Sequence, residues 1–327
     1  GIRDTGTVTG VQTCALPISV KELVAAAMLL ASRDIVGGIA FAQSQDATMS
    51  AQAMNALMEQ EKKRFAGAEL AGKTLGVVGL GAIGSLVARL GLDFGMRVVG
   101  YDPALSVEAA WRLPSDVQRM ENMQSLFSRS DFVSLHLPVL DSTRGLINKE
   151  MLGHFRKGSC LLNFAREEIV DTESIVAALD AKQLRFYVSD FPNPALLGRK
   201  DALMMPHIGA STAEAEENCA VMAASQLKAF LEHGNIRNSV NFPSIELERT
   251  TDCRVTISNR NEPGMLSHIL TLIGDDGLNV ADLLNKSIGD VAYNIIDLDS
   301  APQESLLEKI RSLNGVINLR VIEGPLG

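Results

Sequence analysis

The sequence predicts an α/β protein in which a doubly wound parallel sheet is followed by a smaller unit of order βαββαβ. Two observations carry this prediction. From residue 70, short β-branched runs alternate with longer stretches of helical spacing, which is typical of parallel strands joined through helices. After residue 250 the pattern changes to alternating strands with two amphipathic helices among them, which is the ferredoxin-like order.

The strands of the first unit are expected where continuous apolar runs occur, because strands covered by helices on both faces do not alternate with polar residues. Helical patterns lie between most of these runs, for example at 84–92 and 172–181. The expected strands are Thr74–Gly79, Arg97–Tyr101, Phe132–Leu135, Cys160–Phe164, Phe186–Ser189 and Leu203–Met205.

A long helix is expected from Ser211, because Ser211 and Glu214 have the spacing of a capping box and Gly234 stands where the helix should end. Residues 235–250 are polar, contain a proline and predict a linker. The smaller unit is expected to have strands at 253–258, 279–286, 291–298 and 316–322, with helices at 263–273 and 306–313.

Composition and charge exclude several classes of protein. The chain has 327 residues, of which 46% are hydrophobic and 21% charged, so it can bury a sizeable core. Its formal charge of −9 repels phosphate backbones and anionic membranes, so we expect neither a nucleic-acid nor a membrane partner. The four cysteines are scattered without a C-x-x-C pair. We therefore expect no disulfide framework and no metal site, and a cytoplasmic location fits.

A glycine motif follows the first expected strand and opens the next helix. Gly79, Gly81 and Gly84 form a G-x-G-x-x-G pattern, which permits a tight turn, approach of a pyrophosphate, and close packing of helix on strand. Asp102 ends the next strand, where a carboxylate binds ribose hydroxyls and repels a 2′-phosphate. The sequence therefore predicts a Rossmann-type domain that binds NAD rather than NADP.

Three polar residues, Arg166, Asp190 and His207, follow three consecutive expected strands. In an open α/β sheet, functional groups gather at the carboxyl ends of the strands. An arginine can bind a carboxylate and polarise a neighbouring carbonyl, and a histidine can exchange a proton near neutral pH. This set suits the interconversion of a 2-hydroxy acid and a 2-oxo acid by hydride transfer. His136 also ends a strand and could line the same cleft.

Together these motifs resemble the D-2-hydroxyacid dehydrogenase family over roughly residues 20–327. The resemblance rests on GLGAIG with Asp102, on SLHLPVLDSTRGLIN, LLNFAREEIVD and YVSDFP, and on PHIGAST followed by AEAEEN. It implies that Arg166 binds the carboxylate and carbonyl of a 2-hydroxy-acid or 2-oxo-acid substrate, and that His207 is the proton donor and acceptor. It further implies NAD contacts at Ala82, Ile83, Leu137, Phe164, Ala165, Asp190, Gly209 and Ala210.

The C-terminal stretch resembles an ACT domain, a small-molecule sensing module, through the runs NRNEPG at 259–264 and GLN at 277–279. Within the family such a tail is typical of the phosphoglycerate dehydrogenases, which convert 3-phosphoglycerate to 3-phosphohydroxypyruvate in L-serine biosynthesis. In serine-regulated members, the positions matching Asn259, Asn261 and Asn279 hold the effector. From the residues alone, turn or capping asparagines explain this pattern as well. The resemblance also implies a homo-oligomer.

Two departures from the family pattern concern the site. The glutamate that usually follows the aspartate of YVSDFP and orients the histidine is missing between Asp190 and Leu196. Either another acid supports His207, with Asp190 as the nearest candidate, or the histidine works unassisted. Glu167 stands where the family commonly has glycine. The family also builds its substrate domain from residues upstream of the helix at 20–36, and residues 1–19 do not replace them. We therefore expect this chain to bind NAD but to turn over poorly.

The expected organisation has four segments: a non-native leader at 1–19, an NAD-binding domain at 20–208, a return segment and linker at 209–250, and an ACT-like regulatory domain at 251–327. Two alternatives to phosphoglycerate oxidation remain open. One is a dehydrogenase or reductase of another 2-hydroxy acid, such as hydroxypyruvate or glyoxylate. The other is a non-catalytic sensor of NAD or of an amino acid.

Overall fold

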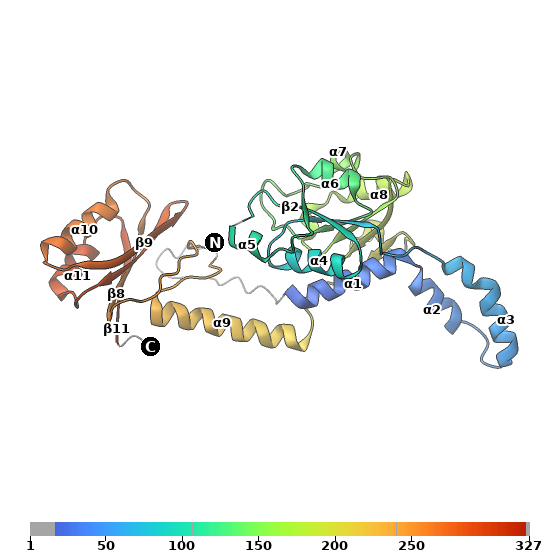
Figure 1. The fold of residues 1–327 in the computed structure, drawn as a ribbon, viewed down its shortest axis with the longest axis horizontal. Coiled ribbons are helices and arrows are strands. Elements are labelled where there is room, and N and C mark those ends of the chain that lie inside the picture. The colour runs from blue at the N-terminus through green and yellow to red at the C-terminus, as the bar shows by residue number, and fades with distance from the viewer. Residues whose placement is uncertain (1–16, 106, 240, 325–327) are drawn as a thin grey trace. The chain divides into compact units, whose positions relative to one another are not determined.

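The computed structural model describes residues 17–105, 107–239 and 241–324 (Figure 1). The chain divides into an N-terminal unit that ends at Glu216 and a C-terminal unit that begins at Glu217, so the division falls inside helix α9 (Ala213–His233). Most of the segment that we interpret as a leader, residues 1–16, lies outside the described residues. Helix α1 (Pro17–Ser32) includes the rest of it.

A parallel sheet of seven strands forms the centre of the N-terminal unit, in the order β3-β2-β1-β4-β5-β6-β7. Strand β1 pairs with β2 on one side and with β4 on the other, so the chain reverses its direction of winding between β1 and β4. This order confirms the predicted doubly wound sheet. The strands are β1 (Thr74–Val78), β2 (Arg97–Tyr101), β3 (Gln118–Arg119), β4 (Phe132–Leu135), β5 (Ser159–Asn163), β6 (Leu184–Ser189) and β7 (Ala202–Met204).

Helices cover both faces of this sheet (Figure 1). On one face, α1 and α4 (Ala82–Asp93) bury apolar side chains such as Met28 and Val87 against β1 and β5. On the other face, α6 (Met123–Arg129), α7 (Lys149–Leu152) and α8 (Thr172–Asp180) do the same. Because both faces are covered, every residue of β1, β4 and β5 is buried, which explains their continuous apolar runs.

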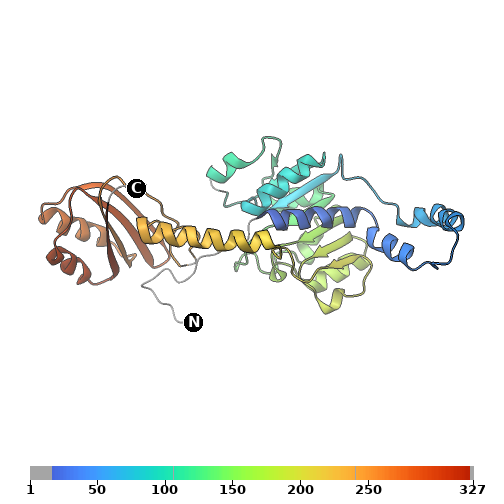
Figure 2. The ribbon, with the colours of Figure 1, turned by 90° about the horizontal axis from the view of Figure 1, so that it is seen from below.

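Two helices between α1 and β1 lie at the periphery of this unit (Figure 2). Helix α1 ends before the expected residue 36 because Asp34 starts α2 (Ile35–Gln43), where its carboxylate accepts a hydrogen bond from the Gly37 amide at 2.9 Å. Helix α3 (Ala51–Glu61) follows. A single helix long and apolar enough to cross a membrane is not found among the described residues. Helices α1 and α2 meet that test only together, with a bend of 72°.

The C-terminal unit contains an antiparallel sheet in the order β11-β8-β10-β9, with two helices on one face. This arrangement is the ferredoxin-like one that the sequence predicts. The elements are β8 (Cys253–Arg260), α10 (Met265–Asp275), β9 (Val280–Ile288), β10 (Val291–Leu298), α11 (Glu304–Arg311) and β11 (Val316–Glu323).

The expected linker at 235–250 is in fact packed against the other face of this sheet. Ile236, Phe242 and Ile245 are buried there with Tyr293 and Ile295 of β10. The backbones of Ile236 and Ile245 also exchange two hydrogen bonds, at 2.8 and 2.9 Å. The polar composition suggested a solvated segment, but three spaced apolar side chains are enough to anchor it.

A buried ion pair fastens this segment and the end of α9 to the sheet. Arg254 and Asp297 have no solvent exposure, and the guanidinium donates to both carboxylate oxygens, at 2.5 and 2.8 Å. Its remaining hydrogens reach the carbonyls of His233, Leu247 and Glu248 at 2.8–3.0 Å. The five N–H groups of the arginine are therefore all bonded.

The carboxyl of Asp297 is held in its charged form by these bonds. Burial alone raises its pKa, but hydrogen bonds from Arg254 and Thr250 outweigh burial, so the pKa lies below its ordinary 3.8. Thr250 contributes both its amide and its hydroxyl, at 3.0 and 3.1 Å. The pair is thus a satisfied polar network rather than an isolated buried charge.

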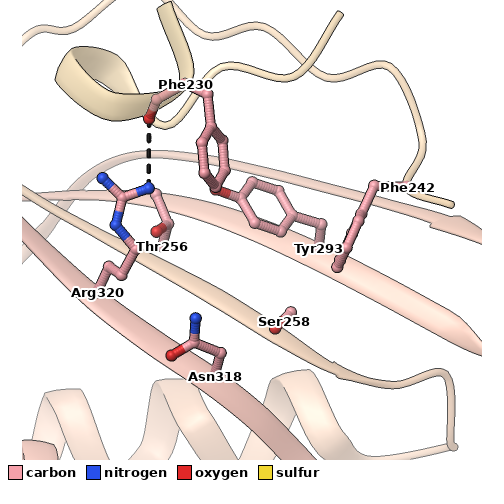
Figure 3. Close-up of a pocket in the computed structure, with 7 residues that line it drawn as sticks. All are labelled: Phe230, Phe242, Thr256, Ser258, Tyr293, Asn318 and Arg320. Carbon is pink, nitrogen blue, oxygen red and sulfur yellow. Dashed lines mark hydrogen bonds between the residues drawn. The ribbon is translucent and has the colours of Figure 1, made fainter. Parts of the chain in front are cut away.

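Two further side chains bind carbonyls at the end of α9 and directly after it, where the helix no longer supplies a full set of amide donors. Arg320 donates to the carbonyls of Phe230 and Leu231 at 3.4 and 3.0 Å, and the Tyr293 hydroxyl donates to Gly234 at 3.0 Å. Figure 3 shows a small pocket in this region, which is lined by Phe230, Phe242, Thr256, Ser258, Tyr293, Asn318 and Arg320. It has room for about one water molecule.

Candidate active site

The three motif glycines lie in different surroundings at the carboxyl end of β1. Gly79 has φ +88°, and a Cβ there would lie 2.3 Å from the His136 carbonyl oxygen. A Cβ on Gly84 would lie 1.8 Å from the Gly79 oxygen. Around a Cβ on Gly81, in contrast, nothing described lies within 4 Å. Packing within the protein therefore requires glycine at positions 79 and 84. Gly81 instead leaves open space at the start of α4, where backbone amides can bind a pyrophosphate.

Asp102 lies beside this loop and is half-buried. One carboxylate oxygen accepts the Leu80 amide at 2.8 Å, and the other accepts the Ala104 amide at 2.9 Å. Each oxygen keeps a further lone pair, so the carboxylate can accept hydrogen bonds from ribose hydroxyls while its charge opposes a 2′-phosphate. The arrangement fits the predicted NAD.

His136 follows β4 on the other side of the glycine loop. Its amide donates to the Val78 carbonyl at 2.8 Å, and Nε2 lies 2.8 Å from the Ser134 hydroxyl. Nδ1 is buried without a hydrogen-bond partner among the described residues. Burial lowers the pKa of this histidine from 6.5 to about 3. The ring is therefore neutral at the point where the sheet reverses its winding, which places it at the edge of the cofactor cleft.

The buried histidine should make the stability of the N-terminal unit depend on pH. Between pH 6.5 and 3, His136 is protonated in the unfolded chain but stays neutral in the folded chain. The free energy of unfolding is therefore expected to fall as the pH falls through this window. His136→Asn removes the titration and should flatten the slope, as measured by urea denaturation at several pH values. His154→Asn, at an exposed histidine of the same unit, is the control, and equal slopes for the two variants would contradict this assignment.

Arg166 follows β5 and is exposed at the same edge of the sheet. The buried amide of Asn163 shapes its turn, since Nδ2 donates to the Arg166 carbonyl at 2.9 Å and Oδ1 accepts the Ala165 amide at 3.1 Å. The guanidinium donates through Nη1 to the Ala165 carbonyl at 2.7 Å. One end of the guanidinium is therefore held, and the other donors remain available to an anionic ligand.

His207 follows β7, and Asp190 follows β6 between it and Arg166. The histidine is exposed, and its ring lies 4.9 Å from that of Phe191, edge to face. Asp190 is buried and its oxygens accept the amides of Ile208 and Gly209, at 2.8 and 2.7 Å. Asp190, the acid that we expected to support His207, thus binds the backbone that follows the histidine.

Asn193 and Glu167 form a contact that the sequence reasoning missed. The Asn193 amide donates to the Glu167 carboxylate at 3.2 Å and to the Thr172 hydroxyl at 3.4 Å, and its oxygen accepts the Ala195 amide. Asn193 lies in the stretch that lacks the family's glutamate, and Glu167 replaces the family's glycine. The two departures were visible separately in the sequence, and the structure joins them.

The other predicted cofactor contacts lie around the same edge. Ala82 and Ile83 begin α4, Leu137 follows His136, and Phe164 and Ala165 are buried in the turn before Arg166. Gly209 is buried against Asp190, and Ala210 is exposed. Direct contact of each with NAD stays a prediction.

The structure brings two of the three predicted effector residues together. Asn259 and Asn261 lie near the turn between β9 and β10, where the Asn261 amide donates to the Gly289 carbonyl. The Asn259 side chain is buried, and its oxygen accepts the Asn294 amide at 2.7 Å. Asn279 precedes β9 and pairs with Asp299 at the other end of the sheet, about 20 Å away. One C-terminal unit thus does not gather all three around one ligand.

The fold and the site define an NAD-binding domain of dehydrogenase type. The model for the D-isomer specific 2-hydroxyacid dehydrogenase, NAD binding domain, matches residues 26–209. The protein belongs to this family.

Relatives and solved structures agree with this assignment. The chain is 31% identical to D-3-phosphoglycerate dehydrogenase of Haemophilus influenzae, over 78% of this chain and 64% of that protein. It is 33% identical to D-3-phosphoglycerate dehydrogenase of Methanocaldococcus jannaschii, over 86% and 51%. A glyoxylate reductase structure from Paecilomyes thermophila has a TM-score of 0.57 at 26% identity, covering 69% of this chain and 66% of that one. The chain spans about half to two thirds of the length of these curated relatives.

Proposed function

We propose that this protein oxidises a small 2-hydroxy acid with NAD, and that the acid is 3-phosphoglycerate, converted to 3-phosphohydroxypyruvate in L-serine biosynthesis. The observation that carries the proposal is the placing of Arg166 and His207 after β5 and β7, at the edge of the sheet that bears the glycine loop. The relatives at 31% and 33% identity support phosphoglycerate as the substrate.

Each residue of the site has a chemical task in this reaction. Arg166 would bind the substrate carboxylate through the donors that Ala165 leaves free, and would polarise the oxygen on C2. The His207 ring donates or accepts no hydrogen bond with another described residue, so its ring nitrogen can take the hydroxyl proton. Bound NAD supplies the acceptor for the hydride that leaves C2. The hydroxyl thereby becomes a carbonyl, with the proton on His207.

The C-terminal unit is proposed to be an ACT-like sensor for an amino acid such as L-serine, in a homo-oligomer. The ferredoxin-like strand order and the exposed Asn261 support this. Because Asn279 lies at the far end of the sheet, a single amino acid could reach all three asparagines only between two copies of the unit.

The test compares substrates and a His207→Ala variant in this chain and, if the gene encodes residues upstream of position 1, in its whole product. NADH formation is expected with 3-phosphoglycerate, at a low rate in this chain, and should fall about 10²–10⁴-fold in His207→Ala, because general acid–base catalysis is lost. NAD affinity, measured by calorimetry, should stay the same. Preference for glyoxylate or hydroxypyruvate would favour the alternative substrate class. Full turnover by His207→Ala would exclude the proposed proton transfer.

A further inference from the structure

Asp190 makes contacts that a role beside the cofactor does not explain. Its side chain is 2% exposed at the end of β6, and each oxygen accepts one backbone amide of the segment that follows β7. These amides belong to Ile208 and Gly209, the two residues directly after His207. Bonds from amides to a charged carboxylate are stronger than bonds between neutral groups. The loop that contains His207, after β7, is thus hydrogen-bonded to a residue that follows the neighbouring strand β6.

The backbone of His207 has a strained conformation that must be stabilised by its surroundings. Its φ is +58°, in the left-handed region that residues with a Cβ avoid. Strained residues of this kind persist only when their surroundings impose the conformation, and they gather at functional sites. A Cβ on Gly209 would lie 2.9 Å from an Asp190 oxygen, so the close approach of the carboxylate also depends on that glycine.

The residue next to Asp190 touches the histidine ring itself. Phe191 presents its ring to His207 at 4.9 Å and 61°, and its own amide donates to the Ser189 hydroxyl at 3.1 Å. The segment that follows β6 therefore contacts the loop of His207 in two ways: Asp190 binds the amides of Ile208 and Gly209, and Phe191 contacts the histidine ring. Proton transfer requires the ring to stand within hydrogen-bond reach of the substrate, so fixing the ring contributes to the rate.

We propose that Asp190 is the positioning residue of His207. Its carboxylate binds the amides of Ile208 and Gly209, keeps the His207 backbone in the left-handed region and thereby holds the His207 ring against Phe191. The proposal rests on the proposed function, in which His207 exchanges the substrate proton. It does not require Asp190 to give or take a proton. The missing glutamate of the family is then replaced in its orienting task by a carboxylate that acts on the backbone.

The test uses Asp190→Asn in the full chain, because an amide can accept with one atom only and its NH₂ would face the second backbone N–H. Loss of a charge-assisted bond should speed hydrogen exchange at Ile208 and Gly209 by about tenfold or more. The NMR signals of the His207 ring should move to where Phe191→Leu places them, since the ring current of Phe191 is lost. Unchanged ring signals in Asp190→Asn would overturn the proposal.

Asp131→Asn is the matched control, because Asp131 also accepts a backbone amide, that of Thr74 at 2.9 Å, but at the amino end of β4. It should change neither the two exchange rates nor the ring signals.

A second pair of variants, made with glycine at position 207, tests whether backbone strain at His207 causes the effect of Asp190→Asn. In His207→Gly, where left-handed backbone is free of strain, Asp190→Asn should accelerate exchange much less, and an undiminished effect would also overturn the proposal. Should Asp190→Asn alone fail to fold, the double variant should fold, and its failure would count against the proposal too. These measurements need no turnover, so a failed assay of the proposed reaction leaves them standing.

Discussion

Replacing Arg254 with alanine is expected to destabilise the C-terminal unit by about 3–5 kcal/mol, because the change leaves the Asp297 carboxylate buried without its partner. Three backbone carbonyls lose a donor as well. The loss can be measured by urea denaturation, with hydrogen exchange of peptides from β8 and β10 to assign it to this unit. Exchange should also rise at the end of α9, whose His233 carbonyl Arg254 binds.

Two further variants separate the sources of this loss. Arg311→Ala breaks the exposed pair with Glu304 in α11 of the same unit and should cost about 0.2–1 kcal/mol. Arg254→Met with Asp297→Leu removes both charges and should recover much of the stability, since apolar replacement of a buried pair is often neutral. The difference in free energy of unfolding that remains between the double variant and the wild type measures the contribution of the hydrogen bonds to His233, Leu247 and Glu248. Equal losses in Arg254→Ala and Arg311→Ala would show that the buried pair is not the anchor.

The fold could be predicted where burial leaves a local pattern in the sequence. Strands β2, β4 and β10 have the bounds that the sequence predicts, because each is rich in apolar residues and is followed closely by a polar residue. Strand β3 could not be found, since its two residues, Gln118 and Arg119, are exposed and carry no pattern. The packed segment at 235–250 was interpreted as a linker because its composition is polar and it contains a proline, which hides its few apolar anchors.

The candidate site divides in the same way. Arg166, Asp190 and His207 could be placed at one edge because the carboxyl ends of parallel strands meet there. The hydrogen bonds at the site could not be predicted where they join segments that are far apart in the sequence. The bonds of Asp190 to the amides after His207, and of Asn193 to Glu167, have no local signature. Sequence thus predicts which residues gather, and the structure is needed to assign what each one holds.

The motif glycines allow stability and cofactor binding to be separated by two substitutions. Gly84→Ala puts a Cβ 1.8 Å from the Gly79 carbonyl oxygen, a contact between backbone and side chain that no rotamer can relieve. It should cost about 3 kcal/mol, at the upper end of the usual range for overpacking, and should weaken NAD binding because the loop must shift. Gly81→Ala meets nothing described within 4 Å and has an ordinary negative φ, so stability should change by no more than about 0.5 kcal/mol.

Gly81→Ala should nevertheless weaken NAD binding by about tenfold or more, a loss of at least 1.4 kcal/mol, since its methyl group would occupy the space that the pyrophosphate needs. Calorimetric titration with NAD measures this loss, and urea denaturation confirms that the fold is intact. Gly274→Ala, in α10 of the other unit, also meets nothing within 4 Å and should change neither quantity, apart from a small gain in helix stability. Wild-type affinity in Gly81→Ala would mean that the phosphates do not approach the chain at this glycine. The open space there would then need another explanation than NAD.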